Sequence, residues 1–204
     1  MAKDRARERA AQMRADQERR DKRSRTLLFG GVAVAAVAVV AGLTWLGLRG
    51  QSGNATASSS IDRLTTYSDL ARDHTEKPVT YPQAPPVGGA HSAVWQNCGW
   101  YDSRVKNENA VHSMEHGAAW ITYSPDLTSD QKAKLKSELA GRTYVVASQY
   151  PGLPAPVVAS AWGGQVQLTG VDDPRLSQFL TAYANSPKAP EPGGECTGGT
   201  GTPS

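Results

Sequence analysis

The stretch AAWITYSPDLTSDQKAKLKSELAGRTYVVAS, residues 118–148, decides the fold. It begins with an apolar and aromatic run, Ala118 to Tyr123, whose composition is typical of a buried strand. Thr128 and Gln131 have the spacing of a capping box, which predicts that a helix begins there. A second run rich in β-branched residues, Thr143 to Ser148, predicts another strand. The stretch therefore predicts a strand, a helix and a strand in succession.

The residues that follow add a hairpin and a second helix. Two short apolar runs, Val157 to Trp162 and Gln165 to Leu168, are separated by Gly163-Gly164, which predicts a hairpin with a two-residue turn. Asp173 as N-cap and Pro174 in the first turn then predict the start of a helix. The order strand, helix, strand, hairpin, helix predicts a small mixed α+β fold.

The segment Leu27 to Leu48 is an apolar run of 22 residues without a charged side chain. A helix needs ~20 apolar residues to cross a bilayer. Ten Lys or Arg residues precede the run, whereas only Arg49 closely follows it, so the positive-inside rule places the N-terminus in the cytoplasm. A cleaved signal peptide is the alternative, but the run exceeds the roughly 7–15 apolar residues of such a peptide. The sequence thus predicts a single-pass membrane protein whose C-terminal part lies outside the cytoplasm.

Composition divides the chain into six parts. Small polar residues without a potential core are typical of a flexible linker, and a Pro-rich stretch is typical of an extended segment. The predicted parts are a basic cytoplasmic tail (1–26), a transmembrane helix (27–48), a flexible linker (49–60), a membrane-proximal segment (61–80), a globular extracytoplasmic domain (81–196) and a disordered tail (197–204).

The net charge of +3 hides an asymmetry between the two sides of the predicted membrane helix. Residues 1–26 hold ten basic and five acidic side chains, a net charge of +5, and the rest of the chain holds twelve and fourteen, a net charge of −2. A domain with a net negative charge is not expected to bind nucleic acid. The predicted partners are the lipid bilayer and a protein of the cell envelope.

The two cysteines, Cys98 and Cys196, lie near the start and the end of the predicted domain. An even number of cysteines outside the cytoplasm favours a disulfide bond. Two free thiols with separate roles are the alternative. A thioredoxin-like redox site is not expected, because the chain has no Cys-x-x-Cys motif.

Three of the four histidines fall within 26 positions, namely His91, His112 and His116. Two imidazoles four residues apart and a third from a loop can hold one metal ion. Met114 and Glu115 add a soft and a hard donor between the last two. The sequence predicts a metal site on these residues, for zinc or for copper, with copper favoured if the thioether is a ligand.

The box from His112 to His116 also fits H-x-x-E-H, a zinc-protease motif in which Glu115 would be the general base. That motif requires a helix. Because Gly117 follows at once and a strand is predicted from Ala118, we expect the box to form a turn. A hydrogen-bonded network without metal, or a surface that binds a protein partner, is the alternative to a metal site. His74 lies in a charged stretch and is predicted to be solvated.

A set of motifs resembles the bacterial domain of unknown function 3105 family. They are Gly89-Ala90-His91 after a Tyr- and Pro-rich loop, the box from Val111 to Gly117, Ala161-Trp162-Gly163 and the late Cys196. The first motif departs from the family pattern, in which Pro would precede the His. The resemblance covers about residues 80–196. It implies a membrane-anchored outer domain, typical of actinobacteria, and carries no activity with it.

The sequence therefore predicts an α+β protein of the cell envelope with one transmembrane helix, one disulfide bond and a His-rich site that binds a metal ion or a partner. Binding is favoured over catalysis. The alternative function is a hydrolase outside the membrane that depends on a metal ion or on a His and Glu pair, with Glu115 as the catalytic residue.

Overall fold

The structure is a computed structural model and describes residues 60–204. The predicted cytoplasmic tail, the predicted transmembrane helix Leu27–Leu48 and nearly all of the predicted linker lie outside the described residues. Within the described residues, no helix has the length and apolar character needed to cross a bilayer.

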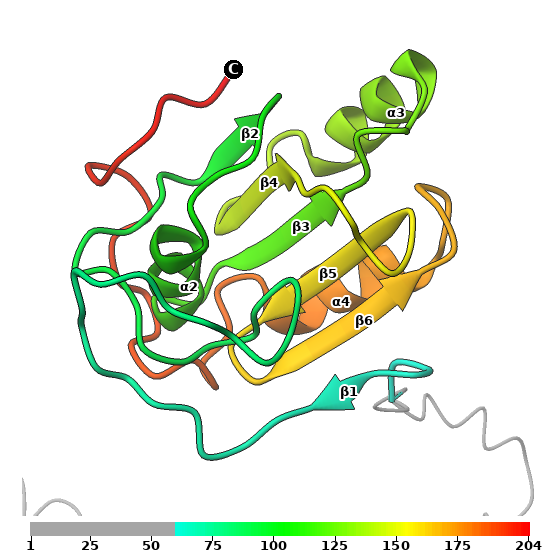
Figure 1. The fold of residues 1–204 in the computed structure, drawn as a ribbon. Coiled ribbons are helices and arrows are strands. Elements are labelled where there is room, and N and C mark those ends of the chain that lie inside the picture. The colour runs from blue at the N-terminus through cyan, green and yellow to red at the C-terminus, as the bar shows by residue number, and fades with distance from the viewer. Residues whose placement is uncertain (1–59) are drawn as a thin grey trace, which may run out of the picture. The chain divides into compact units, whose positions relative to one another are not determined.

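One six-stranded sheet forms the centre of the fold, with the strand order β1-β6-β5-β3-β4-β2 (Figure 1). Its strands are β1 (Thr65–Thr66), β2 (Gly99–Tyr101), β3 (Ala119–Tyr123), β4 (Val145–Gln149), β5 (Val157–Ala161) and β6 (Gly164–Leu168). The helices are α2 (Asn107–Glu115), α3 (Ser129–Leu139) and α4 (Arg175–Tyr183). Strands β2, β4 and β3 are parallel, and the pairs β3–β5, β5–β6 and β6–β1 are antiparallel. The predicted mixed α/β fold is confirmed.

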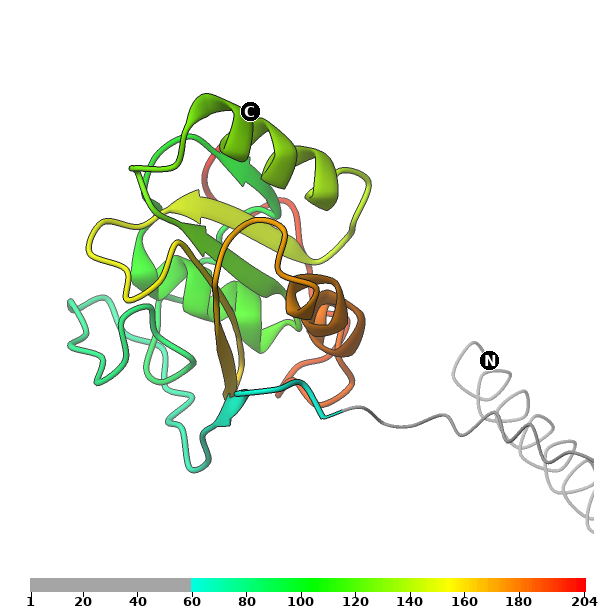
Figure 2. The same cartoon turned by 90° about the vertical axis from the view of Figure 1, so that its right-hand side faces the viewer.

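The two connections that join parallel strands step across the sheet in opposite directions. Helix α2 leads from β2 to β3 and steps over β4, whereas α3 leads from β3 back to β4. Because such connections are right-handed, opposite steps place the two helices on opposite faces. Helices α3 and α4 pack on one face and α2 on the other (Figure 1, Figure 2). The helix α2 thus has one face of the sheet to itself.

Strand β3 divides the core into two apolar clusters by its alternating side chains. Ile121 and Tyr123 belong to the cluster beneath α3 and α4. Trp120 points the other way and packs with Met114 of α2. All four side chains are fully buried. Alternation of this kind follows from the two-residue period of a strand.

Local signals in the sequence are confirmed with small shifts. Thr128 and Gln131 form both hydrogen bonds of the capping box. The hairpin is confirmed, but Ala161 pairs with Gly164, so its turn is Trp162-Gly163 and not Gly163-Gly164. Gly163 has a φ of 72°, which is the conformation that favours glycine at a turn.

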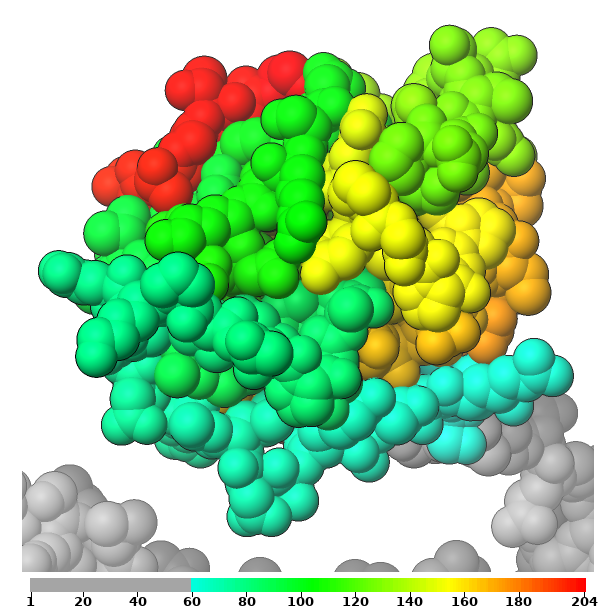
Figure 3. Space-filling view, in the orientation of Figure 1, coloured from blue at the N-terminus to red at the C-terminus, as the bar shows by residue number. Residues whose placement is uncertain are grey.

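The fold extends beyond the predicted limits of the domain. Within residues 61–80, Ile61 is buried and β1 pairs with β6. Within residues 197–204, for which disorder was predicted, Thr200 forms a bridge with Gln96 and the amide of Ser204 donates to a carbonyl of β2. Figure 3 shows this C-terminal end, in red, against the green surface. Composition missed both segments because main-chain pairing, and not apolar side chains, holds most of them.

The start of α4 carries an ion pair between the buried Asp173 and the partly buried Arg175. Asp173 accepts hydrogen bonds from the guanidinium of Arg175, at 2.6 and 3.0 Å, and from the amide of Thr169 at 2.9 Å. These bonds, led by that with Arg175, hold the pKa of the Asp173 carboxyl well below its usual range. The carboxylate also accepts from the amide of Arg175 at 3.1 Å, although Pro174 and not the predicted Asp173 is the N-cap of α4.

We expect Asp173→Asn to lower the free energy of unfolding by about 2 kcal/mol at neutral pH, because it removes a charge-assisted pair. A depressed folded-state pKa stabilises above the unfolded value of about 3.9 and ceases to do so as the pH falls through the folded value. The difference between parent and variant should therefore shrink below about pH 4. Urea denaturation at a series of pH values measures it. A difference independent of pH would contradict this assignment.

Candidate metal centre

The box that contains two of the predicted ligands is helical. The sequence predicted a turn from His112 to His116, but α2 runs from Asn107 to Glu115 and His116 is its C-cap. The prediction was wrong because Gly117, with a φ of 102°, ends the helix sharply enough for β3 to begin two residues later. His112 and Glu115 therefore lie on one face of a helix, three positions apart.

Four side chains converge beside α2. Each of His74, His91, His112 and Glu115 offers one ligand atom, and these atoms all lie within 4.8 Å of one another. His91 comes from the loop before β2 and is held next to His74 by a short main-chain bridge. Relative exposure is 0% for His91, 4% for His112 and 3% for Glu115. The side chain of His74 is 51% exposed, so the group opens to solvent on that side.

Three of the histidines are oriented by main-chain carbonyl oxygens. In each, the Nδ1 atom lies within hydrogen-bond distance of a carbonyl that can only accept, so Nδ1 carries the proton of the neutral ring. The pairs are His91 with Gly89 at 2.8 Å, His112 with Ser92 at 2.6 Å and His116 with Glu195 at 2.6 Å. This arrangement leaves each Nε2 atom with a free lone pair. Histidines that bind metal are usually oriented in the same way, through a hydrogen bond from the other ring nitrogen.

With that tautomer, two short contacts join an Nε2 lone pair to a second acceptor. The Nε2 of His91 lies 2.8 Å from a carboxylate oxygen of Glu115. The Nε2 of His112 lies 2.9 Å from the Nε2 of His116. Two acceptors attract each other only across a cation, which is either an added proton or a metal ion. Around one zinc ion with bonds of about 2.0–2.1 Å, tetrahedral donor atoms lie about 3.3 Å apart. The contact of 2.8 Å between His91 and Glu115 is shorter than this and the whole four-residue group is wider, so its side chains must shift for all four to reach one ion.

The electrostatics of His112 suit a neutral ligand. Burial, followed by the charges of the neighbouring histidines, lowers the pKa of His112 to about 4, although its bond to the Ser92 carbonyl acts in the opposite direction. A desolvated imidazole is neutral at pH 7 and offers its Nε2 lone pair. The donor set therefore fits a first-row transition-metal ion in its chemistry, and its atoms gather within 4.8 Å of one another.

Residues 73–198 match the family described as "Protein of unknown function (DUF3105)". The chain belongs to this family. No curated protein and no solved structure matches the chain. The matched region of the DUF3105 domain begins one residue before His74 and includes both cysteines, so the whole candidate centre lies within it.

The DUF3105 domain brings some of the predicted ligands into one centre and leaves others outside it. His91, His112 and Glu115 share one centre, and His116 lies beside it, 2.9 Å from His112 and 3.7 Å from a carboxylate oxygen of Glu191. His74 is exposed, as predicted, but its ring also stacks on that of His112 with ring centroids 5.0 Å apart. No local pattern in the sequence marks His74 as a ligand. The available signal was that it is the fourth histidine of the chain, after the three predicted ligands.

Met114 has a different environment from its neighbours in the box. It is fully buried in the apolar cluster between α2 and the sheet, against Val111 and Trp120. Its packing accounts for its presence at this position, because a helix that faces a sheet needs apolar side chains at intervals of three and four residues. The argument for copper that depended on the thioether is correspondingly weakened.

We expect Met114→Leu to leave the metal content of the DUF3105 domain unchanged, because a swap that keeps volume in an apolar cluster lowers the free energy of unfolding by less than about 1.5 kcal/mol. Metal analysis and urea denaturation of the same preparation measure both quantities. Loss of metal from a Met114→Leu variant of near-normal stability would contradict this expectation and identify the thioether as a ligand.

Proposed function

We propose that the DUF3105 domain binds a transition-metal ion through His91, His112 and Glu115, with His74 as a fourth ligand. The observation that carries this proposal is the convergence of lone pairs. Main-chain carbonyls occupy the Nδ1 atoms of His91 and His112, and their Nε2 atoms face further acceptors at less than 3 Å. A divalent cation at the centre would satisfy the lone pairs of His91 and His112 and the carboxylate of Glu115 together, with His116 beside the site.

Zinc is the first candidate for the ion and copper the second. Imidazole suits zinc, copper, iron and nickel, and a carboxylate is a common additional ligand of zinc. A thiolate or a thioether would favour Cu(I), but both cysteines form the Cys98–Cys196 disulfide and Met114 packs in an apolar cluster. The nitrogen and oxygen donors support Zn²⁺ or Cu²⁺.

The protein is further proposed to act in the cell envelope, held in the bilayer by Leu27–Leu48 with its N-terminus in the cytoplasm. The support comes from the length of that apolar run, from the basic residues before it, and from the disulfide, which persists in oxidising compartments. An envelope protein that exchanges metal with the domain is the partner that fits an accessible ligand such as His74.

We expect His74→Ala to accelerate metal release about 10-fold or more while the ion still binds. His74 is the exposed member of the group, and the other three ligands are buried. An ion that leaves the site therefore passes His74, and loss of this side chain opens that path. Stopped-flow transfer of Zn²⁺ to a coloured chelator measures the release rate. A matched His91→Ala variant should bind far more weakly. Equal effects of the two substitutions would contradict the role of His74 as the exchangeable ligand.

A metal-dependent hydrolase is the second candidate, because the H-x-x-E-H box does lie at a helix. In such an enzyme Glu115 would polarise a water molecule at an open site. Here its carboxylate is 3% exposed and lies 2.8 Å from His91, so it faces a histidine and not solvent. This placement supports a binding role for Glu115 over that of a general base.

The test is the metal content of the full chain, purified without a histidine tag and measured by inductively coupled plasma mass spectrometry. Stoichiometric zinc or copper in the parent is expected, with none in a folded His112→Ala, His116→Ala double variant. The indole of Trp95, with its ring centroid 5.7 Å from that of His112, offers a fluorescence signal for titration. A parent that binds neither ion after loading, and a double variant that fails to fold, would make the histidine box a structural network.

A further inference from the structure

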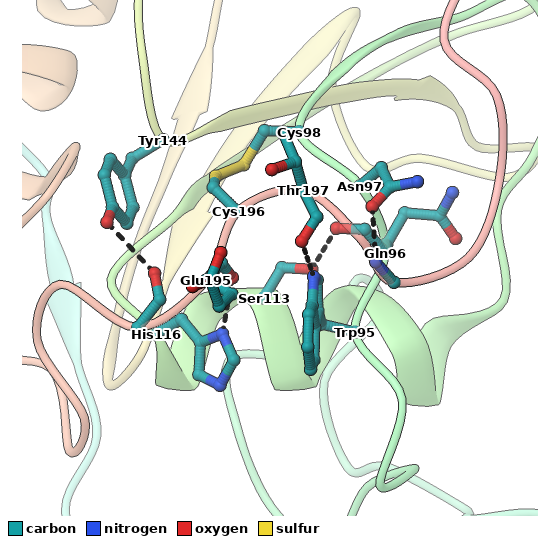
Figure 4. The surroundings of a disulfide bond; sticks show 12 residues. Trp95, Gln96, Asn97, Cys98, Ser113, His116, Tyr144, Glu195, Cys196 and Thr197 are labelled. Atoms are coloured by element: carbon teal, nitrogen blue, oxygen red, sulfur yellow. Dashed lines mark hydrogen bonds between the residues drawn. A yellow bond between two sulfur atoms is a disulfide. The ribbon is translucent and has the colours of Figure 1, made fainter.

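A C-terminal strap, residues 191–199, lies across the end of α2 beside the candidate metal centre. Figure 4 shows the ring of His116 directed to the carbonyl of Glu195, next to the Cys98–Cys196 disulfide. The amide of Glu191 donates to the carbonyl of Glu115 at 3.0 Å. The strap therefore touches the last turn of the helix that bears the ligands.

The strap fits closely against two rings of the site. A Cβ atom on Gly194 would lie 2.6 Å from the ring of His116, and one on Gly199 would overlap the main chain and the indole of Trp95. The indole of Trp95 donates to the carbonyl of Thr197 at 3.1 Å (Figure 4). Trp95 in turn lies with its ring centroid 5.2 Å from that of His116. Glycine at these two positions lets the main chain approach the rings.

The strap has little apolar burial of its own. Each of its residues is exposed or only partly buried. Segments with few buried contacts open at low free energy unless something else holds them. The Cys98–Cys196 disulfide is the covalent restraint, and it ties the strap to the segment that carries Trp95. It adds to hydrogen bonds such as that from the amide of Cys98 to the carbonyl of Cys196 at 2.7 Å.

We infer that the Cys98–Cys196 disulfide makes tight metal binding conditional on oxidation, by holding the Glu195 carbonyl against His116. This inference rests on the proposed function. His116 is oriented by the strap and lies 2.9 Å from His112, so release of the strap frees His116 to rotate and removes the restraint on its neighbour. His116 is thus the outer partner of the ligand His112, and loss of an ordered outer partner of a ligand lowers metal affinity by about 10–100-fold.

The redox step is a thiol–disulfide exchange. The thiols of Cys98 and Cys196 lose two electrons and two protons to a disulfide oxidant, such as oxidised glutathione, which is reduced to two thiols as the bond between the sulfur atoms forms. The chain would thus acquire its full metal affinity after reaching an oxidising compartment, and its reduced form would hold the ion loosely.

The test measures the Zn²⁺ affinity of the full chain by competition with a chelator, in the oxidised parent and in a Cys98→Ser, Cys196→Ser variant. Serine avoids new thiolate ligands. Gly194→Ala keeps the disulfide but pushes on the His116 ring, and Gly170→Ala is its control, since no atom lies within 4 Å of the added methyl. The same comparison in a His116→Ala background shows whether His116 transmits the effect.

We expect the cysteine variant and Gly194→Ala to bind Zn²⁺ about 10–100-fold more weakly than the parent, and Gly170→Ala to match the parent. In the His116→Ala background, loss of the disulfide should have no further effect. Equal affinities with and without the disulfide, or a difference that persists without His116, would overturn the inference. If circular dichroism shows the cysteine variant unfolded, Gly194→Ala decides, and parent-like affinity overturns the inference. A parent that binds no Zn²⁺ overturns the proposed function instead.

Discussion

His112→Ala is expected to lower the affinity of the full chain for Zn²⁺ by about 100-fold or more. Loss of an outer partner of a ligand already lowers affinity by about 10–100-fold, so loss of the ligand itself should exceed that range. His112 is the central residue of the group, since it stacks on His74 and contacts His116. Chelator competition measures the affinity.

Thermal unfolding provides an independent readout of the same variant. An ion that binds only the folded state adds about 2.7 kcal/mol at a free concentration 100 times its Kd. Zn²⁺ at that concentration should therefore raise the Tm of the parent much more than that of His112→Ala. Circular dichroism without metal controls for folding, and His112→Gln is a second variant that keeps a polar side chain. Tight Zn²⁺ binding by a folded His112→Ala chain would remove His112 from the site.

Trp120→Ala is expected to lower the free energy of unfolding by about 3–5 kcal/mol, the range for a large side chain removed from a core. Trp120 is fully buried between α2 and the sheet, and its Nε1 donates to the hydroxyl of Ser148 at 3.0 Å. The substitution leaves a cavity beneath the helix that carries His112 and Glu115. It also deprives the Ser148 hydroxyl of its donor.

Urea denaturation measures the loss as a lower midpoint with an unchanged slope. Val94→Ala is the surface control, because Val94 is 47% exposed and should change the free energy of unfolding by less than about 0.5 kcal/mol. A loss below about 1 kcal/mol for Trp120→Ala would contradict the packing of α2 against β3 through this side chain.

Helix α2 links the fold to the candidate metal centre, because it contributes side chains to both. Helix α2 presents Val111 and Met114 to the sheet and His112 and Glu115 to the loop that carries His91. A short helix with one apolar and one polar face can present both sets of side chains, each to its own side. Substitutions on the apolar side should lower stability first, and those on the polar side should lower metal affinity first.

Much of the fold follows from local patterns. The apolar run around Trp120, the capping box at Thr128 and the hairpin before Leu168 all have short-range physical causes, and the structure confirms each element. The disulfide between Cys98 and Cys196 is confirmed as well. Helix α2 was missed because a strand was expected directly after the box, and only the turn at Gly117 reconciles the two.

The sequence by itself determined that His91, His112 and His116, with Met114 and Glu115 beside them, are chemically suited to a metal ion, because residue type and spacing carry that information. Only the tertiary structure decided which other side chains join or leave this group. His74 joins it through main-chain pairing with His91, and Met114 leaves it because the helix turns the thioether toward Trp120. The carbonyl that orients His116 lies 79 residues further along the chain. Contacts at such separations depend on how the sheet brings distant loops together, which no local pattern encodes.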